Sequence, residues 1–369
     1  MKRIALSALL ICLFPISLLA QNLESDVSPP ALKMNQIQAV GTHNSYKIAI
    51  PAAEMKLIAG FSKKAAISLD YSHKPLVEQL DLGMRQLELD VLYDPKGGRY
   101  ANPGLAKLTK NKEGSSPYDA SAMHAPGYKV LHAQDVDVRS HCPTFVLCLR
   151  QIDAWSKAHP NHVPLLILVN AKDGASAMPL GVRALDYDSA AYDALDAEIR
   201  NVLSPERLIT PDDVRGNAAT LREAVLAGGW PTLDAARGKI FFALDEPPAK
   251  VALYRRGRAS LEGLVMFVNT FNEADPDAAY FTINHPVRQF DRINRLIEEG
   301  YIVRTRADSE PAEARANDPA RFTAALSSGA QYISTDYPTP RADFGPYFIQ
   351  LPGGMPARPN PVSVPSPKP

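Results

Sequence analysis

The chain contains 369 residues, of which 46% are hydrophobic and 22% are charged, and this balance is typical of a folded globular protein. Such a composition excludes a disordered or collagen-like chain. Lys and Arg together number 40, as do Asp and Glu, so the sequence lacks the basic excess with which nucleic-acid binders contact phosphates. We therefore expect no nucleic-acid partner. The length allows either two domains or one large α/β barrel.

The first residues of the chain, 1–20, have the features of an export signal. Lys2 and Arg3 precede an apolar run that extends to Ala20. We expect cleavage after Ala20, a lead-in over residues 21–34, and an exported protein that acts in the periplasm or outside the cell. No later segment approaches the ~18 consecutive apolar residues of a membrane-spanning helix, so the mature chain should be soluble.

Short apolar segments alternate with amphipathic segments along the rest of the sequence. Strands are predicted over 37–43, 84–91, 129–132, 163–170, 239–244, 264–268, 302–305 and 331–334. Helices are predicted over 144–158, 192–203, 221–227, 287–299 and 321–328. This alternation predicts parallel strands joined by crossover helices, and eight such units close into a single-domain TIM-type (β/α)₈ barrel over 35–348.

Two segments depart from this pattern. Residues 93–128 are rich in Gly, Pro, Ser and Lys, and we expect an irregular second crossover there. Residues 351–369 contain seven prolines, so we expect a disordered Pro-rich tail over 349–369.

The two cysteines of the mature sequence, Cys142 and Cys148, are expected to form a disulfide. Export places the chain in an oxidising compartment, where such a pair is more often bridged than free. The bridge closes a short loop and should contribute about 2 kcal/mol to stability. Two buried thiols, or a zinc site with His141 and a fourth ligand, remain alternatives at this point.

Ionisable and amide side chains occur where the first four predicted strands end. They are His43 and Asn44, Glu88 and Asp90, His132, and Asn170. Because Glu88 and Asp90 are two residues apart on one strand, both carboxylates face the same side. Burying two like charges there requires a cation. In this fold the chemistry gathers at the carboxyl ends of the strands, so we expect a site at that end.

The residue types indicate an oxygen-ligated metal and acid–base chemistry. Asn44, Glu88, Asp90 and Asn170 supply two carboxylates and two amide carbonyls, a set that suits Ca²⁺, or less well Mg²⁺ with retained waters. His43 and His132 then remain as proton acceptor and donor on a phosphodiester. Isolated strand-end His and Asn residues are often only packing and turn residues, but the joint pattern has no structural purpose in a packed barrel.

Four motifs together resemble the calcium-dependent phosphoinositide-specific phospholipase C family, and within it the exported bacterial branch. They are HNSY at 43–46, RQLELDV at 85–91, VLHAQDVD at 130–137 and PLLILVNAKD at 164–173. The resemblance extends over about 35–338. It implies that His43 and His132 are the catalytic pair and that Asn44, Glu88 and Asp90 bind calcium. The implied reaction is attack of the inositol 2-hydroxyl on phosphorus, which gives a cyclic phosphate and diacylglycerol.

One position departs from the family pattern. The family's last calcium ligand is a Glu, and the matching residue here is Asn170. An amide oxygen still coordinates calcium but removes one negative charge, so affinity should fall unless an acid such as Asp173 compensates. Lys172 is a candidate for neutralising the substrate phosphate. Arg304 is a candidate for binding the phosphate or headgroup, although a structural ion pair explains it equally well.

Two other functions are compatible with these residues. A glycerophosphodiester phosphodiesterase also uses a barrel, paired histidines and an acid-bound metal, but its usual HRG motif and histidine spacing are absent here. A non-catalytic barrel that binds lipid headgroups, its metal site decayed at Asn170, would not need both histidines. We expect a monomer that acts on a phospholipid or another phosphodiester and contacts a membrane surface transiently.

Overall fold

The computed structural model describes residues 32–309 and 311–364. In this part of the chain, eight parallel strands form a barrel in the order β6-β5-β4-β2-β1-β9-β8-β7. They are β1 (Ile37–Thr42), β2 (Gln86–Leu92), β4 (Leu165–Ala171), β5 (Ile240–Leu244), β6 (Met266–Val268), β7 (Tyr280–Thr282), β8 (Ile302–Arg306) and β9 (Tyr332–Thr335). A parallel bridge between Asn269 and Tyr280 joins β6 to β7 and completes the ring. The predicted TIM-type barrel is confirmed.

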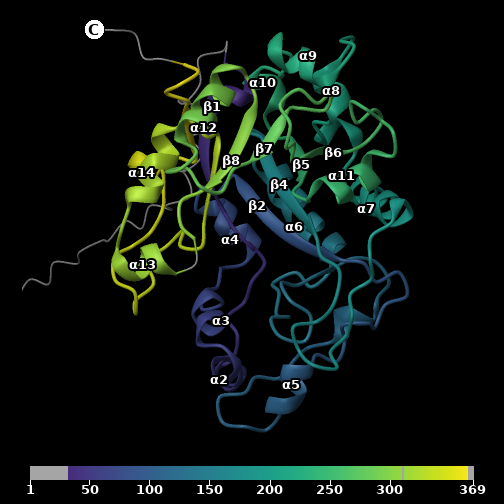
Figure 1. Cartoon of the computed structure of the whole chain (residues 1–369), viewed down its shortest axis with the longest axis vertical. Coiled ribbons are helices and arrows are strands. Elements are labelled where there is room, and N and C mark those ends of the chain that lie inside the picture. Colours follow the sequence, from purple (N-terminus) through teal and green to yellow (C-terminus); the bar gives the residue numbers. More distant parts are fainter. Residues whose placement is uncertain (1–31, 310, 365–369) are drawn as a thin grey trace, which may run out of the picture.

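Helices surround the barrel (Figure 1). The α-helices are α2 (Ala52–Phe61), α3 (Lys63–Ser68), α4 (Leu76–Asp81), α5 (Gly104–Thr109), α6 (Phe145–Ala158), α7 (Ser189–Val202), α8 (Pro211–Arg215), α9 (Leu221–Leu226), α10 (Leu233–Ala236), α11 (Pro248–Arg255), α12 (Phe290–Glu298), α13 (Ala312–Ala316) and α14 (Ala320–Ser327). The described residues also form short 3₁₀ helices, namely η1 (Met34–Gln36), η2 (Ser121–His124), η3 (Pro205–Arg207) and η4 (Pro352–Gly354). The five predicted helices correspond to α6, α7, α9, α12 and α14.

The barrel strands are buried on both faces, which explains their nearly continuous apolar sequences. In β4, every residue from Leu165 to Val169 is fully buried in the main core. In β2, Leu87, Leu89 and Val91 belong to the same core, whereas Glu88 and Asp90 face the other side. Packing of these apolar side chains in the core therefore holds β2 in place and sets the side to which both carboxylates point.

The predicted strand 129–132 is not part of the barrel, and this prediction is corrected. Only β3 (Lys129–Val130) is a strand, and it pairs antiparallel with β2. After β2 the chain makes a long excursion that contains α5 and η2, and β3 returns it along β2 before α6 begins. The irregular second crossover is therefore confirmed, but His132 lies in a loop beside the barrel rather than at the end of a barrel strand.

The eighth barrel strand is instead β7, which sequence patterning missed. β7 has three residues and pairs in parallel with β8. The predicted strands 302–305 and 331–334 correspond to β8 and β9.

The prediction of a disordered tail over 349–369 is wrong for residues 349–364. Ile349 and Leu351 are buried, and β10 (Ala357–Pro359) pairs antiparallel with β1. Asn360 is fully buried and its side-chain amide donates to the carbonyl oxygen of Gly329 (2.6 Å). Proline suits this segment because β10 is an edge strand outside the parallel ring.

The predicted export signal, residues 1–20, lies outside the described residues, as does most of the lead-in 21–34. From that lead-in, Leu32 and Met34 are buried in the main core. Within residues 32–309 and 311–364, none of the helices combines the length and the apolarity needed to cross a bilayer.

Candidate active site

The turn that follows β1 carries His43 and Asn44 and is fixed to β2. Gly41 pairs with Gln86, and a Cβ on Gly41 would lie 2.3 Å from the carbonyl oxygen of Gln86, so only glycine allows this approach. The Ser45 amide donates to the carbonyl oxygen of Glu88 (3.0 Å), and the Glu88 amide donates to the Ser45 hydroxyl (2.8 Å). Asn44 adopts a left-handed backbone conformation with φ 47°. These bonds bring the HNSY segment beside Glu88.

His43 is held from two directions. Its Nδ1 lies 2.8 Å from Oδ1 of Asp336, which follows β9, and its Nε2 lies 3.6 Å from Oε1 of Glu88. The Nε2–H of His73 donates to the backbone carbonyl of His43 (2.7 Å). Burial would raise the pKa of Asp336, but His43 and Arg306 outweigh it and hold this pKa well below its usual value. Because Asp336 stays ionised, it accepts the Nδ1–H of His43 and leaves Nε2 for another partner.

His132 is arranged in the same way. Its Nδ1 lies 2.9 Å from Oδ2 of Asp137, and Lys47 Nζ lies 3.1 Å from the same oxygen. Burial would raise the pKa of Asp137, but Lys47 and His132 lower it overall. The side chain of His132 is 25% exposed and that of His43 is 20% exposed, so both imidazoles are accessible from solvent.

Tyr71 lies between the two histidine–aspartate pairs. Its ring stacks against His43 with centroids 5.9 Å apart, and its hydroxyl accepts a hydrogen bond from the side-chain amide of Asn44 (2.6 Å). Lys47, the partner of Asp137, lies 4.8 Å from the centre of the same ring. Burial raises the pKa of Tyr71, and the nearby charges of Asp336 and Asp137 raise it further. Tyr71 therefore connects the two pairs at one end of the barrel.

Glu88, Asp90 and Asn170 lie together on neighbouring strands. Asp90 of β2 is paired in register with Asn170 of β4, and the Asn170 side-chain amide donates to Oε1 of Glu88 (3.1 Å). The other Glu88 oxygen accepts a hydrogen bond from Arg304 (2.6 Å). Lys172 Nζ lies 3.2 Å from Oδ2 of Asp90. Burial would raise the pKa of Glu88, but His43 and Arg304 outweigh it and lower that pKa.

The chemistry of these donors suits a hard cation. Asp90 is fully buried, and apart from the ion pair with Lys172 (3.2 Å) neither of its oxygens accepts a hydrogen bond within the described chain. Asn44 Oδ1 receives only a long contact of 3.5 Å from the Tyr46 hydroxyl. Among the described residues no group of three or more His, Cys, Asp or Glu is placed to hold a metal, so any site here depends on the amides. Two carboxylates with two amide oxygens fit calcium better than a softer metal.

Several polar groups on the opposite side of the barrel mouth escaped sequence reasoning. Asp245 follows β5 and accepts a hydrogen bond from the side chain of Asn269 (2.9 Å), which follows β6. Burial raises the pKa of Asp245 to about 6. Asn284, after β7, accepts from Arg304 (2.8 Å), so Arg304 links this side to Glu88. A cavity of about 280 Å³ opens beside them, lined in part by Asn269, Asn284 and Gln289.

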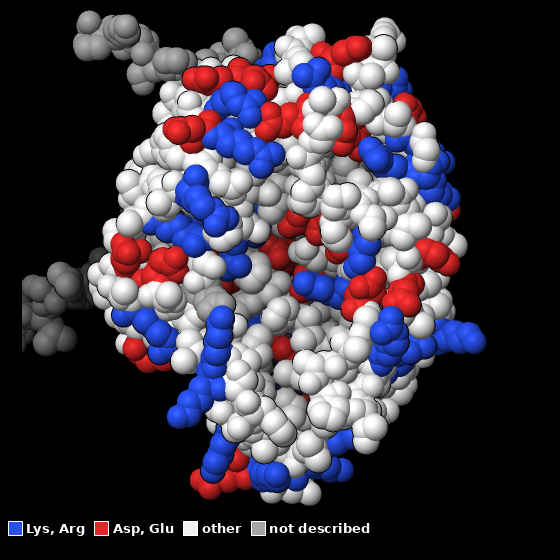
Figure 2. Space-filling model, viewed as in Figure 1, with Lys and Arg blue, Asp and Glu red and all other residues white. Residues whose placement is uncertain are grey.

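Figure 2 shows a hollow in the middle of the viewed face, over the region where Figure 1 places β2 and β4. Acidic and basic side chains meet inside it. Two further acids of the site also follow predicted strands: Asp336 follows the predicted strand 331–334, and Asp245 directly follows the predicted strand 239–244. Asp137 lies within the VLHAQDVD motif, five residues after His132, but was not assigned a role, and the partner of His73 comes from a separate segment.

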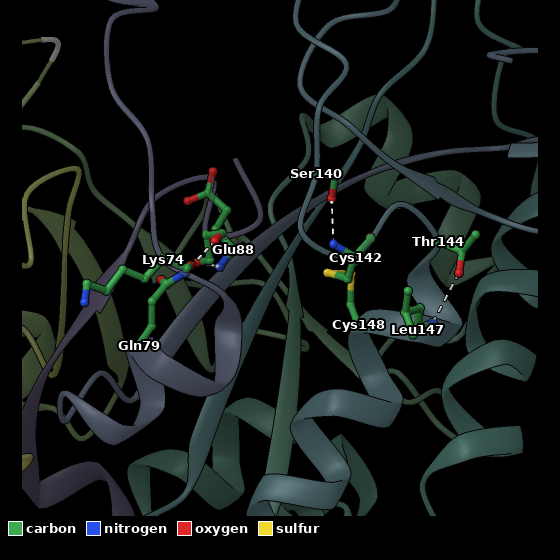
Figure 3. The surroundings of a disulfide bond; sticks show 9 residues. Lys74, Gln79, Glu88, Ser140, Cys142, Thr144, Leu147 and Cys148 are labelled. Atoms are coloured by element: carbon green, nitrogen blue, oxygen red, sulfur yellow. Dashed lines mark hydrogen bonds between the residues drawn. A yellow bond between two sulfur atoms is a disulfide. The ribbon is translucent and has the colours of Figure 1, made fainter. Parts of the chain in front are cut away.

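The predicted disulfide is confirmed. Cys142 and Cys148 are bonded, with Cα atoms 5.1 Å apart (Figure 3). Thr144, between them, caps α6 by accepting a hydrogen bond from the amide of Leu147 (3.3 Å). The bridge therefore ties the segment that follows Asp137 to the start of α6.

Comparison with known proteins identifies the family of the chain. Residues 32–361 match a family model described as phosphoinositide phospholipase C, Ca²⁺-dependent. The match extends over β10, so it includes the C-terminal segment that pairs with β1. A search of curated protein sequences finds no match.

Several solved structures with a similar fold are bacterial phospholipases C. The calcium-dependent phosphoinositol-specific phospholipase C of a Pseudomonas species is 18% identical, covers 90% of this chain and 98% of its own, and superposes with a TM-score of 0.55. The Ca²⁺-dependent phosphatidylinositol-specific enzyme of Streptomyces antibioticus is 20% identical, with 83% and 95% coverage and a TM-score of 0.52. A further structure of the Pseudomonas enzyme, 17% identical with 90% and 98% coverage and a TM-score of 0.55, contains myo-inositol. At these identities the likeness establishes the barrel fold.

Proposed function

Since the chain belongs to the Ca²⁺-dependent phosphoinositide phospholipase C family of phosphodiesterases, we propose that it cleaves phosphatidylinositol-type lipids to diacylglycerol and a cyclic inositol phosphate. His43 and His132 are the catalytic pair in this proposal. The observation that supports it most is the common arrangement of the two imidazoles. The Nδ1 of His43 is hydrogen-bonded to the buried Asp336 and the Nδ1 of His132 to the buried Asp137. Both imidazoles are partly exposed to solvent.

The proton transfers follow from this arrangement. One imidazole takes the proton of the inositol 2-hydroxyl as its oxygen bonds to phosphorus. The other gives a proton to the diacylglycerol oxygen as its bond to phosphorus breaks. Slow hydrolysis of the cyclic product by water would use the same two groups with their roles exchanged. The aspartates fix the ring orientation and stabilise the imidazolium that forms.

We propose that Asn44, Glu88, Asp90 and Asn170 hold the calcium ion of the family. When bound, the ion supplies positive charge that stabilises a phosphoryl oxygen and the attacking hydroxyl. Calcium is preferred to magnesium because it accepts several oxygen ligands in irregular geometry, whereas magnesium requires a nearly ideal octahedron.

Arg304 and the polar groups around it form the candidate headgroup side. The guanidinium of Arg304 is buried between Glu88 and Asn284, so we assign it to holding the Glu88 carboxylate rather than to direct phosphate binding. Asp245 and Asn269 offer acceptors and donors that suit the hydroxyl groups of an inositol ring. Lys172, which is partly exposed beside Asp90, is the candidate for neutralising the phosphate.

We also propose transient contact with a membrane surface through the end of the barrel that carries the site. Figure 1 shows α2, α3 and α5 together at the lower end of the molecule, and α2 and α5 follow the carboxyl ends of β1 and β2. Phe61, at the end of α2, is 85% exposed, and Ile67 and Leu108 are also exposed. The exposed lysines on and next to these helices are Lys56, Lys63, Lys64, Lys107, Lys110 and Lys112.

Apolar side chains among lysines are typical of surfaces that bind anionic lipid headgroups and insert shallowly into a bilayer. Glu54, in α2, is buried and paired with Arg139, so it does not reduce the basic character of this surface. We call the exposed apolar side chains and lysines of α2, α3 and α5 the basic–apolar end. Export through residues 1–20 and action as a monomer complete the proposal.

Product analysis tests the reaction class. The protein is incubated separately with phosphatidylinositol vesicles and with glycerophosphocholine, with calcium or with a chelator. The proposal predicts diacylglycerol and a cyclic inositol phosphate from the first substrate, only when calcium is present. Release of glycerol phosphate from glycerophosphocholine at a comparable rate would instead support a glycerophosphodiester phosphodiesterase. Turnover of neither substrate, with retained binding to the vesicles, would support a non-catalytic headgroup-binding barrel.

A further inference from the structure

The two buried acids of the candidate metal site are already neutralised by two bases of the same chain. Glu88 accepts a hydrogen bond from Arg304 (2.6 Å), and Asp90 lies 3.2 Å from Lys172 Nζ. Asn170, the third side chain of this cluster, is uncharged, so Glu88 and Asp90 face two positive groups, Arg304 and Lys172. A divalent cation entering this cluster therefore meets carboxylates that already have counter-ions.

The two counter-ions differ in their freedom to move. Arg304 is 2% exposed, extends from β8, and is also held by Asn284 (2.8 Å). The Lys172 side chain is 39% exposed and extends from the turn after β4. Its backbone amide is fixed to the carbonyl oxygen of Val91 (2.9 Å), whereas its long side chain can turn toward solvent without disturbing that bond.

We propose that Lys172 is a counter-ion that occupies the calcium-binding carboxylate Asp90 and moves away when calcium binds. This inference rests on the proposed role of Asp90 as a calcium ligand. Calcium needs the Asp90 oxygens, and its charge repels an ammonium group on the same carboxylate. Lys172 therefore lowers the affinity for calcium, in addition to the effect of Asn170. Once displaced, its ammonium group lies at the edge of the site, where the phosphate of a substrate provides a new partner.

Calcium titration calorimetry on four proteins tests this competition. Lys172→Met removes the charge and keeps the length of the side chain, and we expect it to bind calcium about tenfold more tightly than the wild type. Lys172→Arg keeps the charge and should bind calcium like the wild type. Lys157→Met is the matched control, because Lys157 also pairs with an aspartate (Asp153, 2.6 Å) but lies on α6; it should leave the affinity unchanged.

The outcomes separate this inference from the proposed function. Equal affinity of the wild type and Lys172→Met overturns the inference and leaves the metal site intact. If neither protein binds calcium, both the proposed metal ligands and the inference are wrong.

A second measurement uses the unaltered protein, so it remains valid if Lys172→Met folds poorly. Mass spectrometry after amine labelling should show Lys172 reacting about threefold faster with calcium than without it, since a lysine released from an ion pair is more accessible. Lys157 serves as the internal reference. If calorimetry shows calcium binding but the labelling rate of Lys172 does not change, Lys172 is not displaced from Asp90 and the inference is contradicted.

Discussion

Each imidazole of the candidate active site is oriented by a carboxylate that is hydrogen-bonded to its Nδ1 atom. Asp336 lies 2.8 Å from His43, and Asp137 lies 2.9 Å from His132. A neutral partner in place of Asp336 can still accept a hydrogen bond, but it does not stabilise the imidazolium.

Asp336→Asn should therefore lower kcat about 100-fold with little change in KM, because acid–base catalysis is affected more than substrate binding. Steady-state rates on phosphatidylinositol over a pH series check this prediction. Asp291→Asn, on the surface side of α12, is the control and should keep the wild-type profile. A wild-type kcat for Asp336→Asn would mean that His43 does not need a charged partner.

A second aspartate behind Asp336 gives a prediction for stability. Asp308 is buried and accepts a hydrogen bond from the Asp336 amide (2.9 Å). Burial, and then the charge of Asp336, raise the pKa of Asp308 from 3.8 to about 7. The folded protein thus holds this proton more tightly than the unfolded chain, so the contribution of Asp308 to stability falls as pH rises from about 4 through 7.

Asp308→Asn cannot ionise and lacks this dependence. Relative to the wild type, its free energy of unfolding should rise by roughly 2 kcal/mol between pH 5 and pH 8. Urea denaturation of both proteins at the two pH values measures the difference. A constant difference across this range would show that Asp308 is ionised in the folded protein throughout.

Residues of the site were predictable from the sequence where they lie in or directly after a strand with a clear apolar pattern. His43, Glu88 and Asp90 lie at such ends, and the structure places them in contact or on one face. The role of His73 was not predictable, because it contacts His43, 30 residues away in the sequence. Asp137 lies only five residues from its partner His132, inside the VLHAQDVD motif, and was not assigned a role although the motif contains it.

At the scale of elements, the strands within continuous apolar runs were predictable. β4 and β5 are long and apolar, and the three-residue β6 lies in the buried apolar run 264–268, whereas β7, also three residues long, was missed. Residues 129–132 have a strand composition, but the segment before them is irregular, and only Lys129 and Val130 form a strand, which pairs antiparallel with β2. Composition alone does not distinguish an edge extension from a barrel strand.

The C-terminal segment was mispredicted because its prolines suggested disorder. Its few polar contacts are specific: Asn360 donates through its side chain to Gly329, and its backbone amide donates to the carbonyl of Gln36 (2.9 Å). Such contacts are not visible in composition.

Asn360→Ala should lower the free energy of unfolding by about 2 kcal/mol, since it leaves a buried carbonyl without its donor. Thermal or urea denaturation measures the change. The exposed Asn161→Ala is the control and should stay within about 0.5 kcal/mol of the wild type. A tail that contributes nothing to the fold would give equal stabilities for all three proteins.

At the scale of the whole molecule, the regular alternation of strands and helices was sufficient to predict the barrel, and the barrel brings the ends of its parallel strands together. The basic–apolar end lies on segments that follow the carboxyl ends of β1 and β2, the strand ends that also carry His43, Glu88 and Asp90.

Phe61→Ser combined with Lys63→Glu and Lys64→Glu should reduce binding to vesicles that contain anionic lipid about tenfold or more. Sedimentation with vesicles of phosphatidylcholine and phosphatidylserine measures this binding, and hydrolysis of a water-soluble inositol phosphodiester should be unchanged. Leu226→Ser, which alters an exposed apolar residue on α9, is the control. Unaltered vesicle binding by the triple variant would exclude this end as the contact surface.

The most direct test of the mechanism follows the phosphorus of the substrate by ³¹P NMR. Wild type, His43→Ala and His132→Ala are compared on phosphatidylinositol, each with calcium and with a chelator. We predict a cyclic inositol phosphate signal from the wild type with calcium, and rates lower by at least about 100-fold in the other samples. Formation of that product at the wild-type rate by either histidine variant, or by the wild type without calcium, would contradict catalysis by this pair of imidazoles at a calcium site.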